Sequence, residues 1–370
     1  MKAAICRKFG EPLSIEEVSI ASPRQKQVKV RVASCAICHS DIHSIDGSWG
    51  GELPAVFGHE AAGEVVEVGS DVENIRSGDH VTVSLIRSCK NCFYCDSGEP
   101  QLCESKFPDS LISPLRDQNG NTLVQGFDTG AFAEFVVVDQ SQVVPIPKDM
   151  PFDCSALLAC GVITGTGAVI NTAKVVPGSH VVVIGVGGVG LNCIQGARLC
   201  EARTVTAVDL VDEKLDAAKT FGATHTINSS KDDVKQSVIR ICEGRGADYV
   251  FVSVGSVAAF EQGLTLLRPA GTLVVVGMPS VGDRAALEVF DVVDHCFRIV
   301  GSLMGSTILD KDIPNLVKLY KQQQLMLEEL ITGRFPLEQI NDAIANVTRG
   351  NALRNVIVFG DTERPEESLL

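Results

Sequence analysis

The second half of the chain is a series of apolar, β-branched runs separated by helical stretches, a pattern that few folds can accommodate. Continuous rather than alternating hydrophobicity is expected of strands covered on both faces, with the intervening helices as parallel crossovers. Six such strands make a complete doubly wound α/β sheet. The runs cover residues 180–186, 203–210, 225–228, 247–254, 272–278 and 298–304.

The first part of the chain, residues 2–144, has a different pattern. Val28, Val30 and Val32 alternate with polar residues, and residues 63–69 read as a short strand bounded by glycines. Alternation with a period of two predicts strands that are half buried. We therefore expect a β-rich domain before the doubly wound sheet.

The chain ends with two helical stretches, 313–330 and 337–347, and a last apolar strand, 355–359. One further strand is more easily added to the β-rich domain than left alone. We also expect the acidic end, residues 361–370, to be a mobile tail.

A chain of 370 residues is long enough for two domains. The first is expected to contain residues 1–160 and 306–370. Residues 161–305 are expected to form the second domain, inserted into the first.

A glycine-rich run follows the first of the six apolar runs and opens a stretch, 189–202, that reads as a helix. The first glycine permits a tight turn, the second lets backbone approach a pyrophosphate, and the third lets the helix pack on the strand. The helix N-terminus supplies amides and the positive end of the helix dipole. The run predicts a dinucleotide site that contains Gly185, Gly187, Gly188, Val189 and Gly190.

An acidic residue supports a nucleotide at this run. Asp209 ends the next apolar run, 19 residues past Gly190, where a carboxylate can accept hydrogen bonds from both adenosine ribose hydroxyls. It would repel a 2′-phosphate, so NAD is favoured over NADP. Lys214 is a candidate for the same ribose, or a solvated surface lysine. The alternatives are a glycine turn that binds no nucleotide and a site for another adenosine cofactor, such as a methyl donor.

Thirteen cysteines are many for a reducing compartment, and an odd number cannot pair completely. Four of them lie within 15 residues. Four thiolates satisfy a tetrahedral zinc and leave no open position, as in structural sites. Redox chemistry is the alternative, but redox dithiols normally sit at a helix start rather than in a loop that contains Gly and Asn. The expected zinc ligands are Cys89, Cys92, Cys95 and Cys103.

Three further residues, Cys38, His59 and Cys160, are far apart in the sequence. Spacing alone cannot assemble them, and a single His or Cys is often a core residue. Their significance depends on the motifs around them, which are residues 38–43, residues 58–63 and the pair Cys160-Gly161.

These motifs, in this order, resemble those of the zinc-containing medium-chain alcohol dehydrogenases, over essentially the whole chain. The resemblance implies a GroES-like β-rich catalytic domain and a doubly wound Rossmann domain that binds NAD. It implies reversible hydride transfer between NAD and a small-molecule alcohol or aldehyde, and two Zn²⁺ per chain, one catalytic and one structural. It rests on residues 38–43, 58–63, 89–103, 160–161, 185–190 and 353–355.

The resemblance makes Cys38, His59 and Cys160 the protein ligands of the catalytic zinc, which leaves a fourth position for water or substrate oxygen. The ion lowers the pKa of a bound alcohol, and an alkoxide expels hydride more readily than an alcohol does. Ser40 and His43 match the family's proton relay, in which histidine suits the outer position because it exchanges protons near neutral pH.

The resemblance also assigns supporting residues. Asp41 would hold the second nitrogen of His59. Glu60 and Arg354 would lie behind the metal, and Arg354 could also reach the cofactor pyrophosphate. Many animal members have arginine where this chain has His39. A histidine offers the pyrophosphate a weaker, pH-dependent contact, so we expect looser NADH binding.

Trp49, the only tryptophan, lies in the stretch that lines the substrate channel in the family, and Leu85 would add an apolar wall. A large ring there shortens the pocket and can stack on an aromatic substrate. Small or medium primary or secondary alcohols and aromatic alcohols are therefore the expected substrates. The alternative places Trp49 in a loop far from the site.

The formal charge of −14 at pH 7 and the pI near 5.0 argue against nucleic-acid or anionic-membrane partners, because both repel an acidic body. The N-terminus lacks the apolar run of an export signal, and no run approaches the roughly 18 apolar residues of a membrane span. We expect a cytoplasmic protein and, as is usual in the family, a homodimer or homotetramer.

Three other functions remain open. A thiol-adduct (S-hydroxymethyl) formaldehyde dehydrogenase shares every motif and needs basic residues at the pocket mouth. A polyol dehydrogenase commonly replaces one zinc cysteine by a carboxylate, which Cys160 argues against. A non-catalytic, zinc-stabilised NAD-binding protein would have no use for a complete set of ligands and relay residues.

Overall fold

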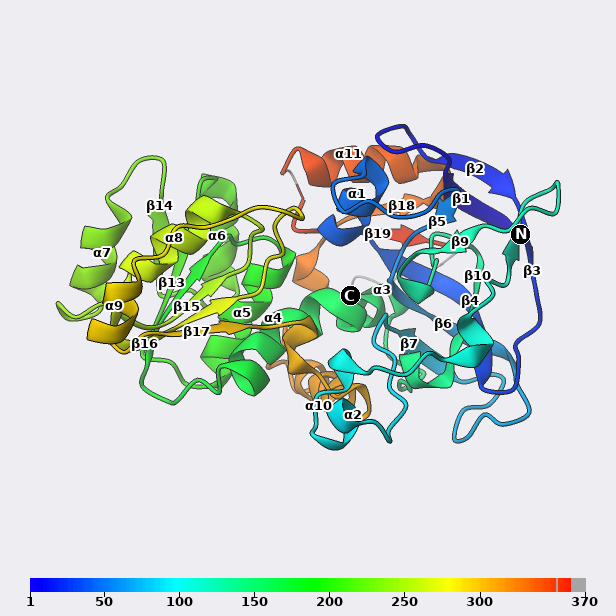
Figure 1. Ribbon diagram of the computed structural model, residues 1–370, viewed down its shortest axis with the longest axis horizontal. Coiled ribbons are helices and arrows are strands. Elements are labelled where there is room, and N and C mark those ends of the chain that lie inside the picture. Colours follow the sequence, from blue (N-terminus) through cyan, green and yellow to red (C-terminus); the bar gives the residue numbers. More distant parts are fainter. Residues whose placement is uncertain (351, 361–370) are drawn as a thin grey trace, which may run out of the picture. The chain divides into compact units, whose positions relative to one another are not determined.

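The computed structural model describes residues 1–350 and 352–360 and divides the chain into two compact units (Figure 1). The chain enters the second unit twice, first as a short loop and later as a long insertion. The first unit contains Met1–Arg87, Lys106–Ala159 and the chain from Ile331 onward, and the second contains Ser88–Ser105 and Cys160–Leu330.

The second unit is built on a six-stranded parallel sheet with the order β14-β13-β12-β15-β16-β17. The order runs outward from β12 in both directions, which is the doubly wound arrangement predicted from the sequence. The strands are β12 (His180–Ile184), β13 (Thr204–Asp209), β14 (His225–Asn228), β15 (Ala247–Val252), β16 (Leu267–Val275) and β17 (Arg298–Gly301). The helices between them are α5 (Gly188–Leu199), α6 (Asp212–Thr220), α7 (Val234–Ile241), α8 (Val257–Thr265) and α9 (Val289–Asp294).

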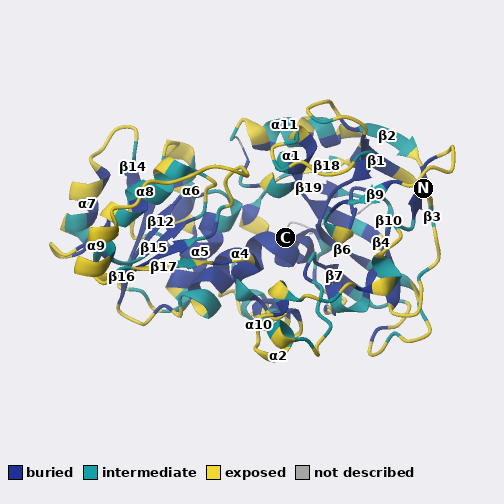
Figure 2. Cartoon of the chain, viewed as in Figure 1, coloured by how far each residue is buried: buried dark blue, intermediate teal, exposed yellow. Residues whose placement is uncertain are grey.

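The inner strands of this sheet form the core of the second unit (Figure 2). Val182, Val250 and Leu273 are completely buried, as expected where helices cover both faces of a sheet. Strand β12 ends at Ile184, two residues before its apolar run does, because Gly185 turns the chain with φ +84°.

The first unit is mostly β-structure, as the sequence predicts. Its largest sheet has the order β11-β7-β6-β4-β19-β18, with β10 also paired to β4; a smaller sheet has the order β2-β1-β5-β9, and β3 pairs with β8. The strands are β1 (Lys2–Cys6), β2 (Ser14–Glu17), β3 (Ser19–Ile20), β4 (Gln27–Ala36), β5 (Ala55–Val56), β6 (Glu60–Val68), β7 (His80–Val83), β8 (Leu115–Arg116), β9 (Val124–Gln125), β10 (Phe135–Asp139), β11 (Val143–Pro145), β18 (Ile331–Pro336) and β19 (Arg354–Val358).

The last strand, β19, joins the N-terminal β-structure, which confirms the expected return of the chain. It runs antiparallel to β4, with Val356 opposite Ala36, and parallel to β18. The backbone N–H of Ile37 donates to the carbonyl of Asn355 at 2.9 Å. This pairing places Arg354 beside the end of β4.

The remaining helices of the first unit are α1 (His39–Asp46), α3 (Phe152–Leu157) and α11 (Ile340–Thr348). Those of the second unit are α2 (Phe93–Asp96), α4 (Ile163–Gly167) and α10 (Leu309–Lys321). Helix α10 ends earlier than the helical stretch expected at 313–330.

The two units divide the chain differently from the expected domains, because residues 88–105 and 306–330 lie in the second unit. Helix α10 buries an apolar face that includes Ile313 within that unit. The ammonium of Lys90 pairs with the carboxylate of Asp310 at 2.7 Å, which ties the two segments together.

Among the described residues, one helical segment, Phe152–Thr172, is long and apolar enough to cross a membrane by composition, with mean hydropathy 1.6. However, 94% of its most apolar window is buried inside the protein. Such burial is typical of a core helix that is apolar all round. The tail expected at residues 361–370 lies outside the described residues.

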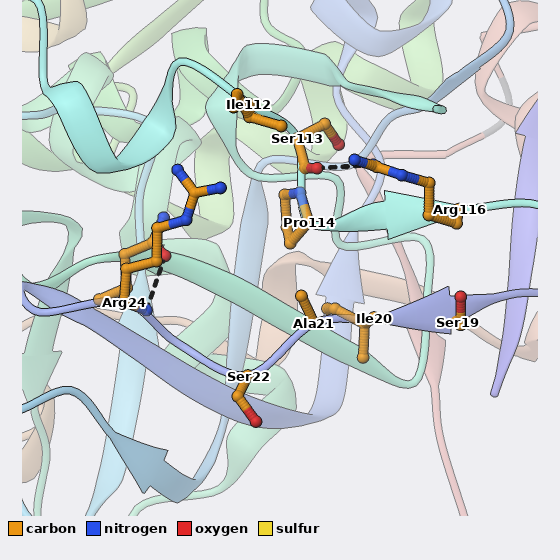
Figure 3. Close-up of a pocket in the computed structure, with 10 residues that line it drawn as sticks. Ser19, Ile20, Ala21, Ser22, Arg24, Ile112, Ser113, Pro114 and Arg116 are labelled. Carbon is orange, nitrogen blue, oxygen red and sulfur yellow. Dashed lines mark hydrogen bonds between the residues drawn. The ribbon is translucent and has the colours of Figure 1, made fainter. Parts of the chain in front are cut away.

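Two surface pockets lie away from the predicted site residues, since none of those residues lines either pocket. One, of about 250 Å³, is formed by β3 and the loop before β8 (Figure 3). Figure 3 shows the Arg116 side chain turned toward Ser113, whose carbonyl accepts its hydrogen bond at 2.8 Å. The other, of about 460 Å³, lies in the second unit among residues of α7, α8 and α9.

Candidate zinc and cofactor sites

The loop around α2 brings the four predicted cysteines together. Cys89 Sγ lies 3.9 Å from Cys95 Sγ, and Cys92 Sγ lies 3.9 Å from Cys103 Sγ. All four sulfurs lie within 4.8 Å of one another. Sulfurs bound at about 2.3 Å to a tetrahedral zinc would be separated by about 3.8 Å. The residues therefore fit a closed zinc site.

Cys92 directly precedes helix α2, so the loop does contain a helix start. The expectation that these cysteines lie away from a helix start was therefore wrong. Hydrogen bonds to the Cys92 sulfur, chiefly from the backbone of Cys95 and of Glu104, lower its pKa to about 6. A thiolate is both the nucleophile of redox chemistry and the form that binds zinc. The approach of four sulfurs rather than one pair favours the metal.

Cys38, His59 and Cys160, which are far apart in the sequence, also lie close together in the structure. Cys38 lies between β4 and α1, His59 directly precedes β6, and Cys160 is the residue at which the chain passes into the second unit. Ligand atoms of these residues and of Glu60 lie within 4.8 Å of one another, and all four residues are buried. Two sulfurs and an imidazole nitrogen are a donor set that suits zinc.

The carboxylate of Asp41 fixes the orientation of His59. Its Oδ1 lies 3.0 Å from His59 Nδ1 and accepts the N–H of Gly58, and its Oδ2 accepts the N–H of Cys38. His59 Nε2 is buried and has no hydrogen-bond partner among the described residues. Because an unpaired buried polar atom is costly, this nitrogen fits a metal ligand.

The same carboxylate controls the charge of the imidazole. Burial lowers the pKa of His59, but the negative charge of Asp41, the hydrogen bond to it and the neighbouring Cys38 sulfur together outweigh burial and hold that pKa well above its usual value. A metal at Nε2 needs that nitrogen unprotonated, and Asp41 then keeps the remaining proton on Nδ1.

Glu60 belongs to the same cluster and forms a buried ion pair with Arg354. Burial raises the pKa of the Glu60 carboxyl, and the guanidinium of Arg354 opposes that rise. The family resemblance implies that Glu60 lies behind the metal. In the structure, one of its oxygens lies with the donor atoms, so this carboxylate is a fourth candidate ligand.

The predicted relay residues, Ser40 and His43, lie three positions apart on α1 and therefore share a face of that helix. Cys38 Sγ donates to Ser40 Oγ at 3.6 Å, so the hydroxyl lies beside a metal-site sulfur. The His43 ring lies 5.2 Å from the Trp49 ring, and its Nδ1 lies 3.9 Å from the carboxylate of Asp46.

The expected pocket residues, Trp49 and Leu85, are both half-buried. Trp49 packs on the outer histidine of the relay, and Leu85 follows β7 by two positions. Their contact with substrate stays a prediction.

The glycine run forms the turn between β12 and α5. Gly185 has φ +84°, and a Cβ at Gly190 would lie 1.9 Å from the carbonyl oxygen of Gly185. Packing therefore explains these two glycines. A Cβ at Gly187 would meet no protein atom within 4 Å. The open space at the start of α5, where Gly188 and Val189 begin the helix, suits a phosphate group.

Asp209 lies at the end of β13, beside the glycine turn. Its carboxylate accepts the backbone N–H groups of Val186 and Leu210, both at 2.8 Å. Lys214 is half-buried on α6, and His39 is exposed at the start of α1. The cofactor contacts expected of these residues and of Arg354 stay predictions.

Sequence reasoning missed Phe127, whose ring lies 4.7 Å from the His59 imidazole. Phe127 has φ +53° in the 3₁₀ turn Gly126–Asp128. The flanking glycines, Gly126 and Gly130, were the available signal of an unusual turn. However, no spacing rule relates positions 127 and 59.

The two parts of this architecture match two domain families. Residues 24–148, most of which belong to the β-rich unit, match the alcohol dehydrogenase GroES-like domain. Residues 188–322, which begin with the first residue of α5, match the zinc-binding dehydrogenase domain. The chain therefore belongs to the zinc-containing medium-chain alcohol dehydrogenase family, as the motifs predicted.

Relatives that align with the whole chain support the same family assignment. Alcohol dehydrogenase-like 7 of Arabidopsis thaliana is 36% identical over 97% of this chain and 95% of its own length. Probable S-(hydroxymethyl)glutathione dehydrogenase 1 of Schizosaccharomyces pombe is 37% identical over 96% of each chain. The crystal structure of benzyl alcohol dehydrogenase from Acinetobacter calcoaceticus has a TM-score of 0.91 at 32% identity and covers 97% of this chain and 99% of its own. The protein is thus similar throughout to zinc alcohol dehydrogenases and is an oxidoreductase of that kind.

Proposed function

We propose that this protein is an NAD-dependent alcohol dehydrogenase that transfers hydride reversibly between NAD and a small, medium or aromatic alcohol, primary or secondary. The observation that carries the proposal is the buried donor set of Cys38, His59 and Cys160, in which His59 Nε2 lacks a partner among the described residues. With these three residues as ligands, and the Glu60 carboxylate held in its ion pair with Arg354, zinc keeps one open position for an alcohol oxygen. The four-cysteine loop would hold a second zinc.

Each site residue then has a task. The bound zinc would supply the positive charge that favours a deprotonated alcohol. Asp41 holds His59 through Nδ1 and so keeps Nε2 available. Ser40 would accept the alcohol proton at Oγ as it releases its own hydroxyl proton, which passes through the nicotinamide ribose to His43, on the same face of α1.

The preference for NAD over NADP is based on Asp209. Its carboxylate lies against the glycine turn through the N–H of Val186, where a 2′-phosphate would meet a like charge. His39 would give the pyrophosphate a contact that depends on protonation. We therefore expect NADH to bind more weakly at pH 8 than at pH 6, and equal affinities would exclude that role for His39.

A spectrophotometric screen at 340 nm tests the activity. Protein of known zinc content is assayed with NAD or NADP against short, branched, aromatic and polyol alcohols. We expect activity with NAD and two zinc ions per chain. Cys38→Ala should abolish activity and keep one zinc. Cys35→Ala, which alters a buried thiol three residues away, should keep both. Two bound zinc ions without activity on any alcohol would contradict the proposed substrates.

A thiol-adduct formaldehyde dehydrogenase is the second candidate, because the Schizosaccharomyces pombe relative is named for S-(hydroxymethyl)glutathione. Formaldehyde is therefore assayed with and without glutathione. Activity that needs both compounds, with little on simple alcohols, would favour this candidate over the first.

We also propose that the protein is a cytoplasmic homo-oligomer that binds neither nucleic acid nor membranes. The charge of −14 supports the absence of anionic partners. Strand β17 is an edge of the parallel sheet, and the preceding helix α9 exposes Phe290 and Val293, at 70% and 74%. A second copy of the chain could cover an unpaired strand edge and an apolar helix face.

A further inference from the structure

The loop from Gly126 to Gly130 holds two successive non-glycine residues in the left-handed region. Phe127 and Asp128 both have φ +53°. A bulky side chain rarely adopts this conformation, which persists only where surrounding contacts enforce it. Strained backbone of this kind concentrates at functional sites. Reversal of the chain direction alone does not explain why this loop has two strained residues.

Several contacts enforce the conformation. The Asp128 carboxylate pairs with Arg87 at 2.6 Å, and the Asp128 carbonyl accepts Gln142 Nε2 at 3.2 Å. The hydroxyl of Thr129 donates to the carbonyl of Phe127 at 2.9 Å. Gln142 and Thr129 are both buried, so the strained turn is anchored to the core of the first unit.

The aromatic side chains around the turn form a packed series of contacts that ends at His59. A Cβ at Gly126 would lie 2.3 Å from the ring of Phe57, and that ring lies 6.3 Å from the ring of Phe127. The Phe127 ring in turn lies 4.7 Å from the His59 imidazole, with 57° between the two planes.

We propose that this loop is a positioning device for His59, in which the strained turn at Phe127 and Asp128 holds the Phe127 ring against the imidazole. Asp41 fixes one edge of His59 through Nδ1, but a single hydrogen bond permits the ring to tilt about it. A packed aromatic side chain restricts that tilt and keeps Nε2 directed at its ligand position. Phe127 thus acts on the metal through His59. The inference rests on the proposed function, because it assumes that His59 binds zinc.

The test follows zinc release from the purified holoenzyme into a chromogenic chelator, with kcat and KM measured on the same preparations. The release phase that belongs to this site is the one absent from His59→Ala. Phe127→Leu removes the flat ring but stays apolar, and we expect release from this site to be roughly 10-fold faster and kcat to fall. Release from the four-cysteine loop should not change. Phe127→Tyr keeps the ring and should stay near wild type.

Asp128→Gly tests the strained turn, because it removes the ion pair with Arg87 and relieves the left-handed strain. We expect an unchanged or raised Tm together with faster zinc release from the His59 site. Asn74→Gly is the matched control, since Asn74 is another exposed residue at positive φ, +61°. It should relieve strain without changing zinc release.

Three outcomes would be decisive against these assignments. If Phe127→Leu changes KM alone and leaves zinc release unchanged, the inference is overturned and Phe127 is a wall of the substrate pocket. Equal acceleration of both release phases would indicate general loosening and would also overturn it. A wild-type protein without zinc at His59, or without alcohol activity, would instead contradict the proposed function before any variant is compared.

Discussion

At the scale of single residues, Asp41 links the local fold to the chemistry of the site. Its carboxylate is completely buried, and its oxygens meet His59 Nδ1 and the N–H groups of Gly58 and Cys38. A buried carboxylate is tolerated because these partners satisfy it. The same contacts fix the start of α1 and the direction of the imidazole, so one side chain positions two of the predicted zinc ligands.

Asp41→Asn should therefore affect the metal more than the fold. The amide keeps the size, but its NH₂ group cannot accept a hydrogen bond. We expect zinc at the His59 site to bind about 10- to 100-fold more weakly, with a parallel loss of kcat. The test measures the zinc content of the variant after dialysis together with its kcat. Asp71→Asn, at an exposed position, is the control. A variant that keeps both zinc ions and full activity would contradict the role of Asp41.

Substitution of two glycines of the dinucleotide turn should have different effects, one on NADH binding and the other on stability. Gly187→Ala adds a methyl group to open space, so we expect an unchanged Tm and weaker NADH binding. Gly190→Ala forces a Cβ against the carbonyl of Gly185 and should lower the Tm by several degrees through overpacking of about 1–3 kcal/mol. Thermal unfolding and NADH fluorescence titration distinguish them. Equal effects of both variants on stability would show that the turn is not open at Gly187.

At the scale of elements, the four-cysteine loop, residues 88–105, depends on its sulfurs for order. Pro100 is the one buried residue in this fully described segment, so the loop has almost no apolar core of its own. The ion pair of Lys90 with Asp310 is exposed and contributes little. A bound metal would therefore supply most of the energy that holds the loop.

Cys103→Ser should remove one zinc ion per chain, make the loop sensitive to protease, and lower the Tm. Serine would replace one of the four thiolate ligands by a hydroxyl, which is a poor zinc ligand. Among the described residues, no further cysteine belongs to this cluster and could take its place. Zinc analysis and limited proteolysis measure the change. Cys296→Ser alters an exposed thiol outside the loop and should leave both readouts unchanged. Retention of two zinc ions by Cys103→Ser would refute the assignment.

Strand β19 shows how an element from the end of the chain completes a site near its beginning. Its pairing with β4 brings Arg354 to Glu60, 294 positions away. Neither charge would be tolerated alone in this buried position. The C-terminal strand therefore supplies both an inner strand of the sheet, between β4 and β18, and a compensating cation for the metal cluster.

At the scale of the whole molecule, the exposed apolar surface at α9 and β17 predicts self-association, and the acidic charge predicts no nucleic-acid or membrane partner. Light scattering should give a mass above the 39.4 kDa of one chain. Phe290→Asp places a charge on the exposed face of α9 and should lower that mass, whereas Phe93→Asp, on the exposed helix α2, should not. A monomeric wild-type protein at micromolar concentration would contradict the expectation.

Features that depend on local pattern were predictable from the amino-acid sequence alone. The six strands were predictable because most of them are continuous apolar runs that alternate with helical stretches, and the four-cysteine loop because its ligands lie within one short segment. The glycine run and Asp209 were predictable because the turn from a strand into the next helix is specified by residues that are close together in the sequence. The motifs that identify the family were likewise readable without coordinates, and the comparisons confirmed them.

Only the tertiary structure decided what depends on contacts between distant segments. It brought Cys38, His59 and Cys160 together with Glu60, and it assigned residues 88–105 and 306–330 to the second unit. It also placed Phe127 against His59 through a strained turn. The physical reason is that periodicity records which face of an element is buried, but not which remote side chain covers it, because that choice is made by packing.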